Sequence, residues 1–508
     1  MRKRKLRIAI SMAMVALVTI FPIATFAEEA PDANKTVYTE GEDKTVGNVT
    51  VETNESEKSA MGVDVYAPGA SKSDVTLNVK GDVSATSGEK SYGATGVLVD
   101  AFEGGTANVT VEGKVTATST AGESNLGPAT TGVYSYTSDE GKANVSVNNG
   151  ISATTNGDGY ASALGVTSYD DSAVNIKSNG DMVAKSGSDA ICINIDSNQN
   201  STTDVTVNGN VTATSSAVAT GMYIELEDGA KTNVMVNGSV TATSEDYANG
   251  LNLNLLSEDN VANIKIMGDL VTSGTGIFVN GWEDTYQNEK GETVHEESKF
   301  MGTANIVIDG TLDAKDIAIS KGNAVPGNLN LTVWKIIPNK DGNIAEVLND
   351  DYNYVTDTET ESRIMYIIKI EEGEGYALLA SNANGGELGT SEGYNIGFEG
   401  EKILVGIDVK DGYKLKAVYN GLTGEKVEIV KDADGKYYVV VPKGGGVYLS
   451  AEVEKIATTA VNNTAKLAAK NPTPPTGDSF NKMFAIVLML ISLVGIDTVV
   501  ALKKKLNA

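Results

Sequence analysis

The sequence is poor in the residues that build disulfides, metal sites and cationic surfaces. Its 508 residues include one cysteine, Cys192, and one histidine, His295, which excludes an intramolecular disulfide and a zinc site made of several histidines or thiolates. Beyond residue 7 the only arginine is Arg363. Because 67 acidic residues outnumber 40 basic ones and give a formal charge of −27, the chain should repel nucleic acid. We therefore expect no cofactor, no metal site and no nucleic-acid partner.

Aromatic residues are also scarce, at 6% of the chain, whereas glycine reaches 54 residues. Valine, threonine, serine and asparagine are abundant. This mixture is typical of turn-rich β-structure with modest side chains and argues against a helical enzyme core. The composition therefore predicts an all-β protein.

The first 27 residues have the pattern of a secretory signal peptide. Five basic residues near the start precede a long apolar run. The small residues Thr25 and Ala27 occupy the −3 and −1 positions, and acidic Glu28 follows at once. We expect a signal helix over residues 1–27, cleavage between Ala27 and Glu28, and a mature protein outside the cytoplasm. The alternative is an uncleaved membrane anchor.

The C-terminus carries three features in a fixed order. A proline-rich spacer at residues 471–478 precedes an apolar run at 484–502, and three lysines follow at 503–505. A run of this length can cross a bilayer, and the lysines would remain on the cytoplasmic side. The sequence therefore predicts a C-terminal transmembrane helix over residues 484–502.

This order resembles the sorting signal of Gram-positive surface proteins, in which the pattern Leu-Pro-any-Thr-Gly precedes the apolar segment. Residues 473–508 match it at Pro474, Thr476 and Gly477, whereas Thr473 stands where the family has leucine. The resemblance implies that a sortase cuts between Thr476 and Gly477 and joins the protein to peptidoglycan. A plain C-terminal membrane anchor is the alternative, and either one places the protein at the cell surface.

A nine-residue motif recurs through the middle of the chain. Its strong copies are Val79–Ser87, Val111–Ser119, Val207–Ser215 and Val236–Ser244, and weaker copies start at Val147, Ile176, Ile266 and Ile308. The apolar residue after the motif's glycine recurs about every thirty residues, with one longer step near the end: Val83, Val115, Ile151, Val183, Val211, Val240, Leu270 and Leu312. A period of this length indicates a solenoid.

Each repeat contains three short runs in which apolar and polar residues alternate, as expected for strands. One copy shows them at residues 204–207, 211–214 and 221–226. The third run starts with glycine in most copies, at Gly62, Gly96, Gly132, Gly165, Gly221, Gly250 and Gly276. The sequence thus predicts three strands per turn of a coil.

The Asn-Gly pair between the first two runs is also a hairpin signal. A two-residue hairpin at Asn208 and Gly209 would place neighbouring valines on opposite faces and leave no core. With a three-residue corner, four side chains of the two strands all point to the interior: Val205, Val207, Val211 and Ala213. We therefore expect a corner between two strands of one turn.

We predict a parallel β-helix of about 30 residues per turn over residues 45–320, preceded by an N-terminal cap at 28–44. The repeats resemble the pectin-lyase-like β-helix of many bacterial surface proteins, which implies a right-handed solenoid. An array of β-sandwiches is the structural alternative.

The chain beyond the repeats divides into three parts. Residues 321–395 are strand-like but irregular and are expected to form a β-rich cap or transition region. Residues 396–456 resemble the small β-modules of the internalin B-repeat type, which implies a stalk or spacer. Residues 457–475 are rich in alanine, asparagine, threonine and proline, and we expect a wall-spanning linker there.

Enzymes also use β-helices, so function has to be argued from a site and not from the fold. The repeats contain no arginine to act as a lyase-type base. Hydrolases need carboxylates that converge, and the carboxylates here lie mostly in turns, such as Asp170 and Asp171. We expect Cys192 to be a packed small residue. No catalytic residue is predicted.

An insertion late in the repeats is the best candidate for ligand binding. It runs from Trp282 to Phe300, and its Trp282 and Tyr286 could stack on a sugar or contact a protein. The alternative is that these aromatic side chains pack on the coil.

The sequence therefore favours a non-catalytic cell-surface protein tethered to peptidoglycan, which acts as an adhesin or presents a surface to host or bacterial glycans or proteins. One alternative is an extracellular polysaccharide lyase or hydrolase, which acids clustered in a shared groove would favour. Another is a purely structural coat or spacer. An outer face of threonine, serine and asparagine would favour adhesion.

Overall fold

The computed structural model describes residues 34–456, apart from 56–57, 70–73, 121–128, 158, 280–281, 288–292, 299, 322–326, 349–353, 356–361 and 422–425. The described residues form strands and turns, so this part of the chain is all-β, as predicted. The signal helix expected at 1–27 and the membrane helix expected at 484–502 lie outside it. Within the described ranges, no helix is long and apolar enough to cross a membrane.

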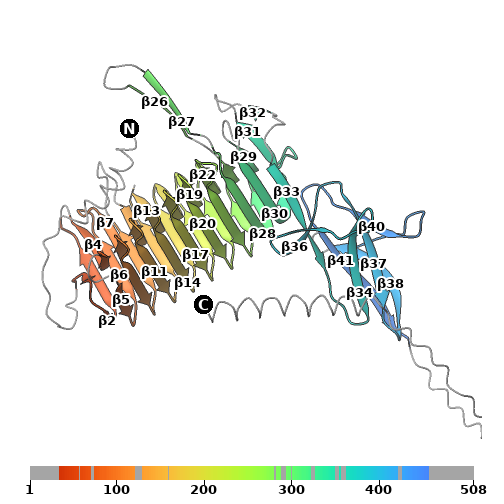
Figure 1. The fold of residues 1–508 in the computed structure, drawn as a ribbon, viewed down its shortest axis with the longest axis horizontal. Coiled ribbons are helices and arrows are strands. Elements are labelled where there is room, and N and C mark those ends of the chain that lie inside the picture. Colours follow the sequence, from red (N-terminus) through yellow and green to blue (C-terminus); the bar gives the residue numbers. More distant parts are fainter. Residues whose placement is uncertain are drawn as a thin grey trace, which may run out of the picture. The chain divides into compact units, whose positions relative to one another are not determined.

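The strands coil into stacked turns with three faces, each a parallel ladder (Figure 1). Face 1 contains β2 (Lys44–Val46), β5 (Asp74–Val79), β8 (Thr106–Val111), β11 (Lys142–Val147), β14 (Ala173–Ser178), β17 (Thr202–Val207), β20 (Lys231–Val236), β23 (Val261–Ile266), the first half of β28 (Thr303–Ala314) and β30 (Asn328–Ile337). Face 2 contains β3 (Val49–Thr53), β6 (Val83–Ser87), β9 (Val115–Ser119), β12 (Ile151–Thr155), β15 (Met182–Ser186), β18 (Val211–Thr214), β21 (Val240–Thr243), β24 (Leu270–Thr272) and the second half of β28.

Face 3 contains the longest regular strands. Its members are β1 (Val37–Glu40), β4 (Ser59–Ala67), β7 (Gly93–Ala101), β10 (Ala129–Thr137), β13 (Tyr160–Ser168), β16 (Asp189–Ser197), β19 (Val218–Leu226), β22 (Tyr247–Leu255), β25 (Thr275–Val279), β29 (Ile317–Lys321) and β31 (Ala345–Leu348), with β32 (Tyr354–Val355) antiparallel at the end. Each turn therefore stacks on the one before it, which is the architecture of a β-helix.

The predicted corner is confirmed. β17 pairs in parallel with β14 and β20, and β18 pairs in parallel with β15 and β21, so Asn208–Asn210 connect two faces and do not close a hairpin. The four residues expected to face inward are at most 1% exposed: Val205, Val207, Val211 and Ala213. The alternation of apolar and polar residues thus fills a continuous core between the faces.

One weak repeat is out of register with the prediction. Met182, and not Val183, pairs with Ile151 on one side and Val211 on the other, and Met182 is fully buried. Ser178 likewise occupies the inner position that Val207 holds in the next turn. The sequence prediction is wrong for this copy because Ser178 stands where the other copies have an apolar residue, and the nearby apolar residues Ile176 and Val183 match the repeat in its place.

The corner glycine is required by close stacking of turns. A Cβ atom on Gly209 would lie 2.6 Å from the backbone nitrogen of Asp181 in the preceding turn, nearer than real Cβ atoms approach. The Asp181 carboxylate also accepts a hydrogen bond from the Asn210 nitrogen at 2.7 Å. Asn-Gly in this motif therefore serves turn-to-turn packing and not hairpin closure.

The turns that lead from face 3 back to face 1 contain residues in the left-handed backbone conformation. Positive φ angles occur in consecutive pairs on successive turns: Asp139 and Glu140, Asp170 and Asp171, Gln199 and Asn200, and Asp228 and Gly229. Such angles favour Asp, Asn and Gly. Backbone bonds then link turn to turn, for example from the Glu140 nitrogen to the Asp170 carbonyl at 2.8 Å. This geometry explains why acidic residues gather in these turns.

The chain leaves the coil through β33 (Ser362–Ile370) and enters a smaller β-structure. One group of strands there is β35 (Gly389–Ser391), β36 (Tyr394–Gly397), β38 (Tyr413–Gly421), β39 (Lys426–Glu428) and β41 (Val447–Lys455). A three-stranded antiparallel sheet contains β34 (Tyr376–Asn382), β37 (Lys402–Val409) and β40 (Tyr437–Val440). The late insertion forms the hairpin β26 (Trp282–Gln287) and β27 (Thr293–Ser298) (Figure 1).

Candidate functional site

Most sequence-predicted site residues lie outside the described part of the chain. These are the expected signal-cleavage residues Ala27 and Glu28 and the expected sortase residues Pro474, Thr476 and Gly477. They remain predictions.

The expected ligand-binding residues Trp282 and Tyr286 lie on the hairpin strand β26. Trp282 pairs with Ser298 and Tyr286 with Val294, while His295 stands opposite Thr285. The two residues stand at the first and fifth positions of this strand.

Face 1 presents a ladder of amide side chains on its outer surface. One residue per turn occupies the same register position: Asn108, Asn144, Asn175, Asp204, Asn233, Asn263, Asn305 and Asn330. Within it, the Asn263 amide donates to the Asn233 side-chain oxygen at 2.9 Å, and Asn233 donates to Asp204 at 2.7 Å. Asn144, Asn305 and Asn330 likewise each donate to the asparagine of the preceding turn.

A second amide ladder runs along the corner between faces 1 and 2. Asn179 donates to Asn148 at 3.0 Å, Asn208 to Asn179 at 2.8 Å, and Asn237 to Asn208 at 2.6 Å. These residues include the asparagine of the Asn-Gly motif. This asparagine therefore recurs because it bonds to the asparagines of neighbouring turns, a contact that the sequence of a single repeat does not show.

Face 2 carries two outer columns of hydroxyl side chains. The first contains Ser84, Thr116, Ser152, Thr212 and Thr241, and the second contains Thr86, Thr118, Thr154, Thr214 and Thr243. Val183, Lys185 and Val271 interrupt them. Faces 1 and 2 together present an outer surface dominated by threonine, serine and asparagine.

Face 3 differs because a row of aromatic rings crosses its first turns. Tyr66, Phe102, Tyr136 and Tyr169 are all partly exposed, and successive ring centroids lie 5.8, 5.3 and 6.1 Å apart. This row is not among the candidate residues predicted from the sequence. The sequence does contain a signal for it, because Tyr66 and Tyr136 both stand four residues after a glycine that begins the third run of its repeat.

Two carboxyl groups lie on the same face as the aromatic row. Asp100 pairs in register with Tyr66 and Tyr136, and Asp64 lies on the neighbouring strand. Asp100 is 8% exposed, and its burial, followed by repulsion from Asp64, raises its pKa well above the usual range. Burial raises the pKa of Asp64 to about 6. These carboxyls lie on strands, whereas the sequence predicts carboxylates mostly in turns.

A second polar group occupies a later part of face 3. The Tyr223 hydroxyl donates to the Glu225 carboxylate, and the Asn254 amide donates to the Tyr223 oxygen at 2.9 Å. Glu225 is 7% exposed and Asn254 is 8% exposed. Polar side chains of adjacent turns are therefore held in fixed orientations on this face.

The single thiol is unsuited to nucleophilic chemistry. Cys192 is fully buried, and this burial raises the pKa of its thiol to about 12. Since the thiolate is the reactive form, Cys192 is inert in the folded protein. The expectation that it is a packed small residue is confirmed.

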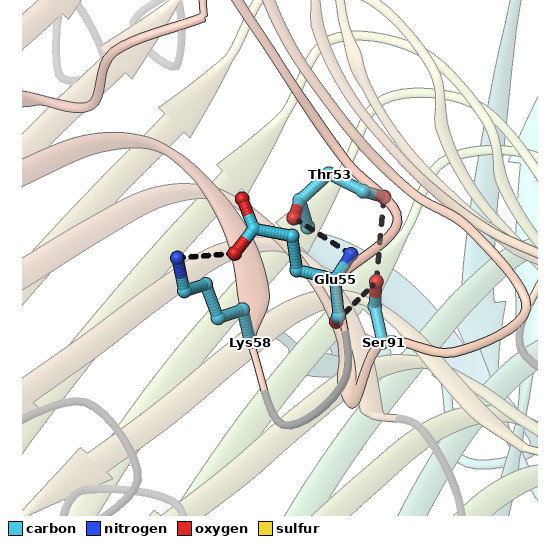
Figure 2. A network of polar contacts seen from close by, with 4 residues as sticks. All are labelled: Thr53, Glu55, Lys58 and Ser91. Atoms are coloured by element: carbon cyan, nitrogen blue, oxygen red, sulfur yellow. Dashed lines mark hydrogen bonds and ion pairs between the residues drawn. The ribbon is translucent and has the colours of Figure 1, made fainter.

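The loop between faces 2 and 3 in the first turns is held by a local polar network (Figure 2). The Ser91 hydroxyl lies 3.3 Å from the carbonyl oxygens of both Thr53 and Glu55, and Lys58 pairs with the Glu55 carboxylate at 2.5 Å. Ser91 is 3% exposed. This network connects Ser91 to the residues that follow β3 and does not gather catalytic groups.

The charged side chains do not assemble into a metal centre in the part of the chain that the structure describes. There, no group of three or more His, Cys, Asp and Glu side chains could hold a metal ion. Comparison of the chain with known protein families, curated proteins and solved structures found no match. Function therefore has to be argued from the surfaces described above.

Proposed function

We propose that this chain is a non-catalytic surface protein of a Gram-positive bacterium that acts as an adhesin. In this proposal residues 1–27 direct secretion, and a sortase joins Thr476 to peptidoglycan through the signal at Pro474–Gly477. The coil, right-handed as crossovers between parallel strands generally are, then projects from the wall.

The observation that carries the adhesin proposal is the composition of faces 1 and 2. Most positions in the outer columns described above carry a neutral hydroxyl or amide group, and these groups recur at the roughly 4.8 Å spacing of paired strands. Such groups can donate and accept hydrogen bonds to sugars or to protein backbones without a cofactor. A ligand that extends along the coil could make the same weak contact many times.

The aromatic row on face 3 and the pair Trp282 and Tyr286 are the proposed anchor points for a ligand. Aromatic side chains supply large contact areas and are enriched where proteins bind partners. The exposed acidic turns beside the row, such as Asp139 and Glu140, would repel polyanions. We therefore favour uncharged or basic ligands, whether glycan or protein.

A glycan and host-protein array probed with residues 28–470 tests this proposal. We expect binding that falls when Trp282 and Tyr286, or Phe102 and Tyr136, are replaced by alanine. Tyr419→Ala, in the region after the coil, is the matched control and should bind as the unchanged protein does. Absence of binding to every glycan and protein on the array would support the coat or spacer instead.

One observation favours the alternative of a polysaccharide-degrading enzyme. Asp64 and Asp100 are neighbouring carboxyls with raised pKa values, and such groups can serve as general acids near neutral pH. Release of reducing sugar by the purified protein, abolished in both Asp64→Asn and Asp100→Asn, would establish this enzyme and overturn the adhesin. Binding without product would leave the adhesin standing.

A further inference from the structure

The coil and the β-structure that follows it share one strand. The first half of β33 pairs in parallel with β30, the last strand of face 1, through Leu329–Val333 and Ser362–Tyr366. The second half pairs in parallel with β41, through Ile368–Ile370 and Val447–Leu449. β33 therefore belongs to both parts.

β41 forms backbone hydrogen bonds along both of its edges, next to the shared strand β33. The Glu371 nitrogen donates to the Leu449 carbonyl at 2.8 Å, next to the paired segment. Just before β41, the Gly446 nitrogen donates to the Trp334 carbonyl at 2.7 Å, and the Ile336 nitrogen donates to the Gly444 carbonyl at 2.8 Å. On its other edge β41 forms an antiparallel ladder with β38.

Side chains reinforce the same joint. Lys369 lies 2.8 Å from an Asp309 carboxylate oxygen and stacks over the Trp334 ring at 4.9 Å. Trp334 in turn makes an edge-on contact with Tyr448 at 6.4 Å. Inside the joint Val447 and Leu449 are fully buried. Polar and apolar contacts therefore connect β30, β33 and β41.

We propose that β30, β33 and β41 form a mechanical clamp that resists tension between a ligand held on the coil and an anchor beyond Ile456. Its role on the cell rests on the proposed function, because tension arises there only if the chain is anchored at its C-terminus and bound at the coil. The resistance itself is a property of the strand arrangement.

The direction of the strands gives the physical reason. Tension enters β41 at its C-terminal end, Lys455, and enters β33 at its N-terminal end, Ser362, where it joins the coil. Because the two strands run parallel, these opposite pulls act along both strands and across their hydrogen bonds. The bonds are then loaded together in shear and must break together. A force that separates two paired strands from one end would instead break their hydrogen bonds one pair at a time.

Single-molecule pulling on the full chain tests the clamp through its dependence on direction. One handle is attached at Asn200→Cys, on an exposed turn of the coil, and the other at Ile456→Cys, directly after β41. In the control, the second handle moves to Lys443→Cys, in the exposed turn before β41, so that β33 and β41 are pulled at the same end and their hydrogen bonds break pair by pair. We expect the highest rupture force with the Ile456 handle. Equal or lower force there would overturn the proposal.

A matched pair of substitutions locates the resistance. Glu371→Pro removes the backbone donor to Leu449, whereas Glu371→Ala keeps it. We expect Glu371→Pro to lose the high-force rupture with the Ile456 handle and Glu371→Ala to retain it; equal forces in the two variants would overturn the assignment to β33 and β41. If Glu371→Pro does not fold, as judged by its circular dichroism, the comparison of handles decides alone.

Failure of the clamp and failure of the adhesin remain distinguishable. The pulling experiment needs no ligand, so a negative binding array leaves its result unchanged. Conversely, a protein that binds its ligand but ruptures equally easily in both directions is an adhesin without this clamp.

Discussion

A Cβ atom on Gly221 would lie 2.6 Å from the Cγ1 atom of Val240 in the next turn of the coil. Gly221 falls opposite Cys192 in one neighbouring turn and Gly250 in the other. From β4 to β29 the same inner position is occupied by a small residue: Gly62, Gly96, Gly132, Ala163, Cys192, Gly221, Gly250, Gly276 and Ala318. Face 3 approaches face 2 closely along this column.

Gly221→Val should therefore destabilise the coil strongly. Its added side chain would meet the Gly250 carbonyl oxygen at 2.5 Å as well as Val240, and overpacking of this kind costs about 1–3 kcal/mol or more. Urea unfolding followed by circular dichroism measures the change. Gly47→Val is the control, because a Cβ atom there meets nothing within 4 Å. Equal stability of the two variants would contradict the close approach.

Cys192 should be inaccessible to thiol reagents in the folded protein. It is fully buried with a thiol pKa of about 12, so labelling by a disulfide reagent at pH 8 should proceed only as fast as the protein opens. Denaturant should make the reaction immediate. Rapid labelling of the native protein would show that this column is open to solvent.

Substitution of Cys192 itself tests which side chains fit at the small-residue position of face 3. Cys192→Ala should change stability little, since Ala163 and Ala318 hold the same position in other turns. Cys192→Leu should be destabilising by about 1–3 kcal/mol, because the added atoms have no space. Thermal unfolding of the two variants measures the difference, and a harmless leucine would contradict the packing argument.

The pH dependence of stability should reveal the buried carboxyl of Asp64. Its pKa is raised from 3.8 to about 6 in the folded protein, so the folded state holds its proton more tightly than the unfolded state. Stability from this group is therefore fully present below pH 3.8 and is lost as the pH rises through about 6. The loss is on the order of 3 kcal/mol, because the pKa shifts by about two units and one pKa unit is about 1.4 kcal/mol.

Asp64→Asn isolates this contribution. The variant should lose less stability than the unchanged protein between pH 4 and pH 7, as measured by urea unfolding at several pH values. Asp100 titrates in the same direction and remains in both proteins, so only the difference between them reports on Asp64. Identical pH profiles would show that Asp64 is solvated in the folded state.

The amide ladder should contribute modestly to stability. Asn233→Ala removes the donor to Asp204 and the acceptor for Asn263. These bonds lie at the surface, where the net value of each is about 0.5–1.5 kcal/mol at most. Met235→Ala, exposed on the same strand, is the control and should cost less. A larger cost for Met235→Ala would contradict a stabilising ladder.

The inner pattern of each repeat could be read from sequence because it is local. Val205 and Val207 alternate with polar residues, and a three-residue corner was the one connection that kept Val211 on the same side. Hydrophobic burial then requires a coil. The register of the weak copy could not be read in this way, because Ser178 and Met182 show their inner positions only when neighbouring turns are aligned to them.

The candidate surfaces were less predictable than the core. Trp282 and Tyr286 were singled out because they lie in an insertion, which is visible in the sequence. The rings of Phe102 and Tyr136 belong to different repeats and different positions within the repeat, so only stacking of the turns brings their centroids to 5.3 Å. Asp100 was missed for the same reason, since its burial depends on residues of adjacent strands.

Single repeats are enough to predict an all-β chain coiled with three strands per turn, because period, alternation and corner chemistry are local properties of each repeat. Only the pairing of neighbouring turns shows that Ala163, and not Gly165, holds the small-residue position of its turn, since Gly165 pairs with outward-facing Tyr134. Strand pairing also shows that β33 joins two parts of the chain. Both depend on which strands become neighbours, and neighbours are chosen by packing across turns that no single repeat encodes.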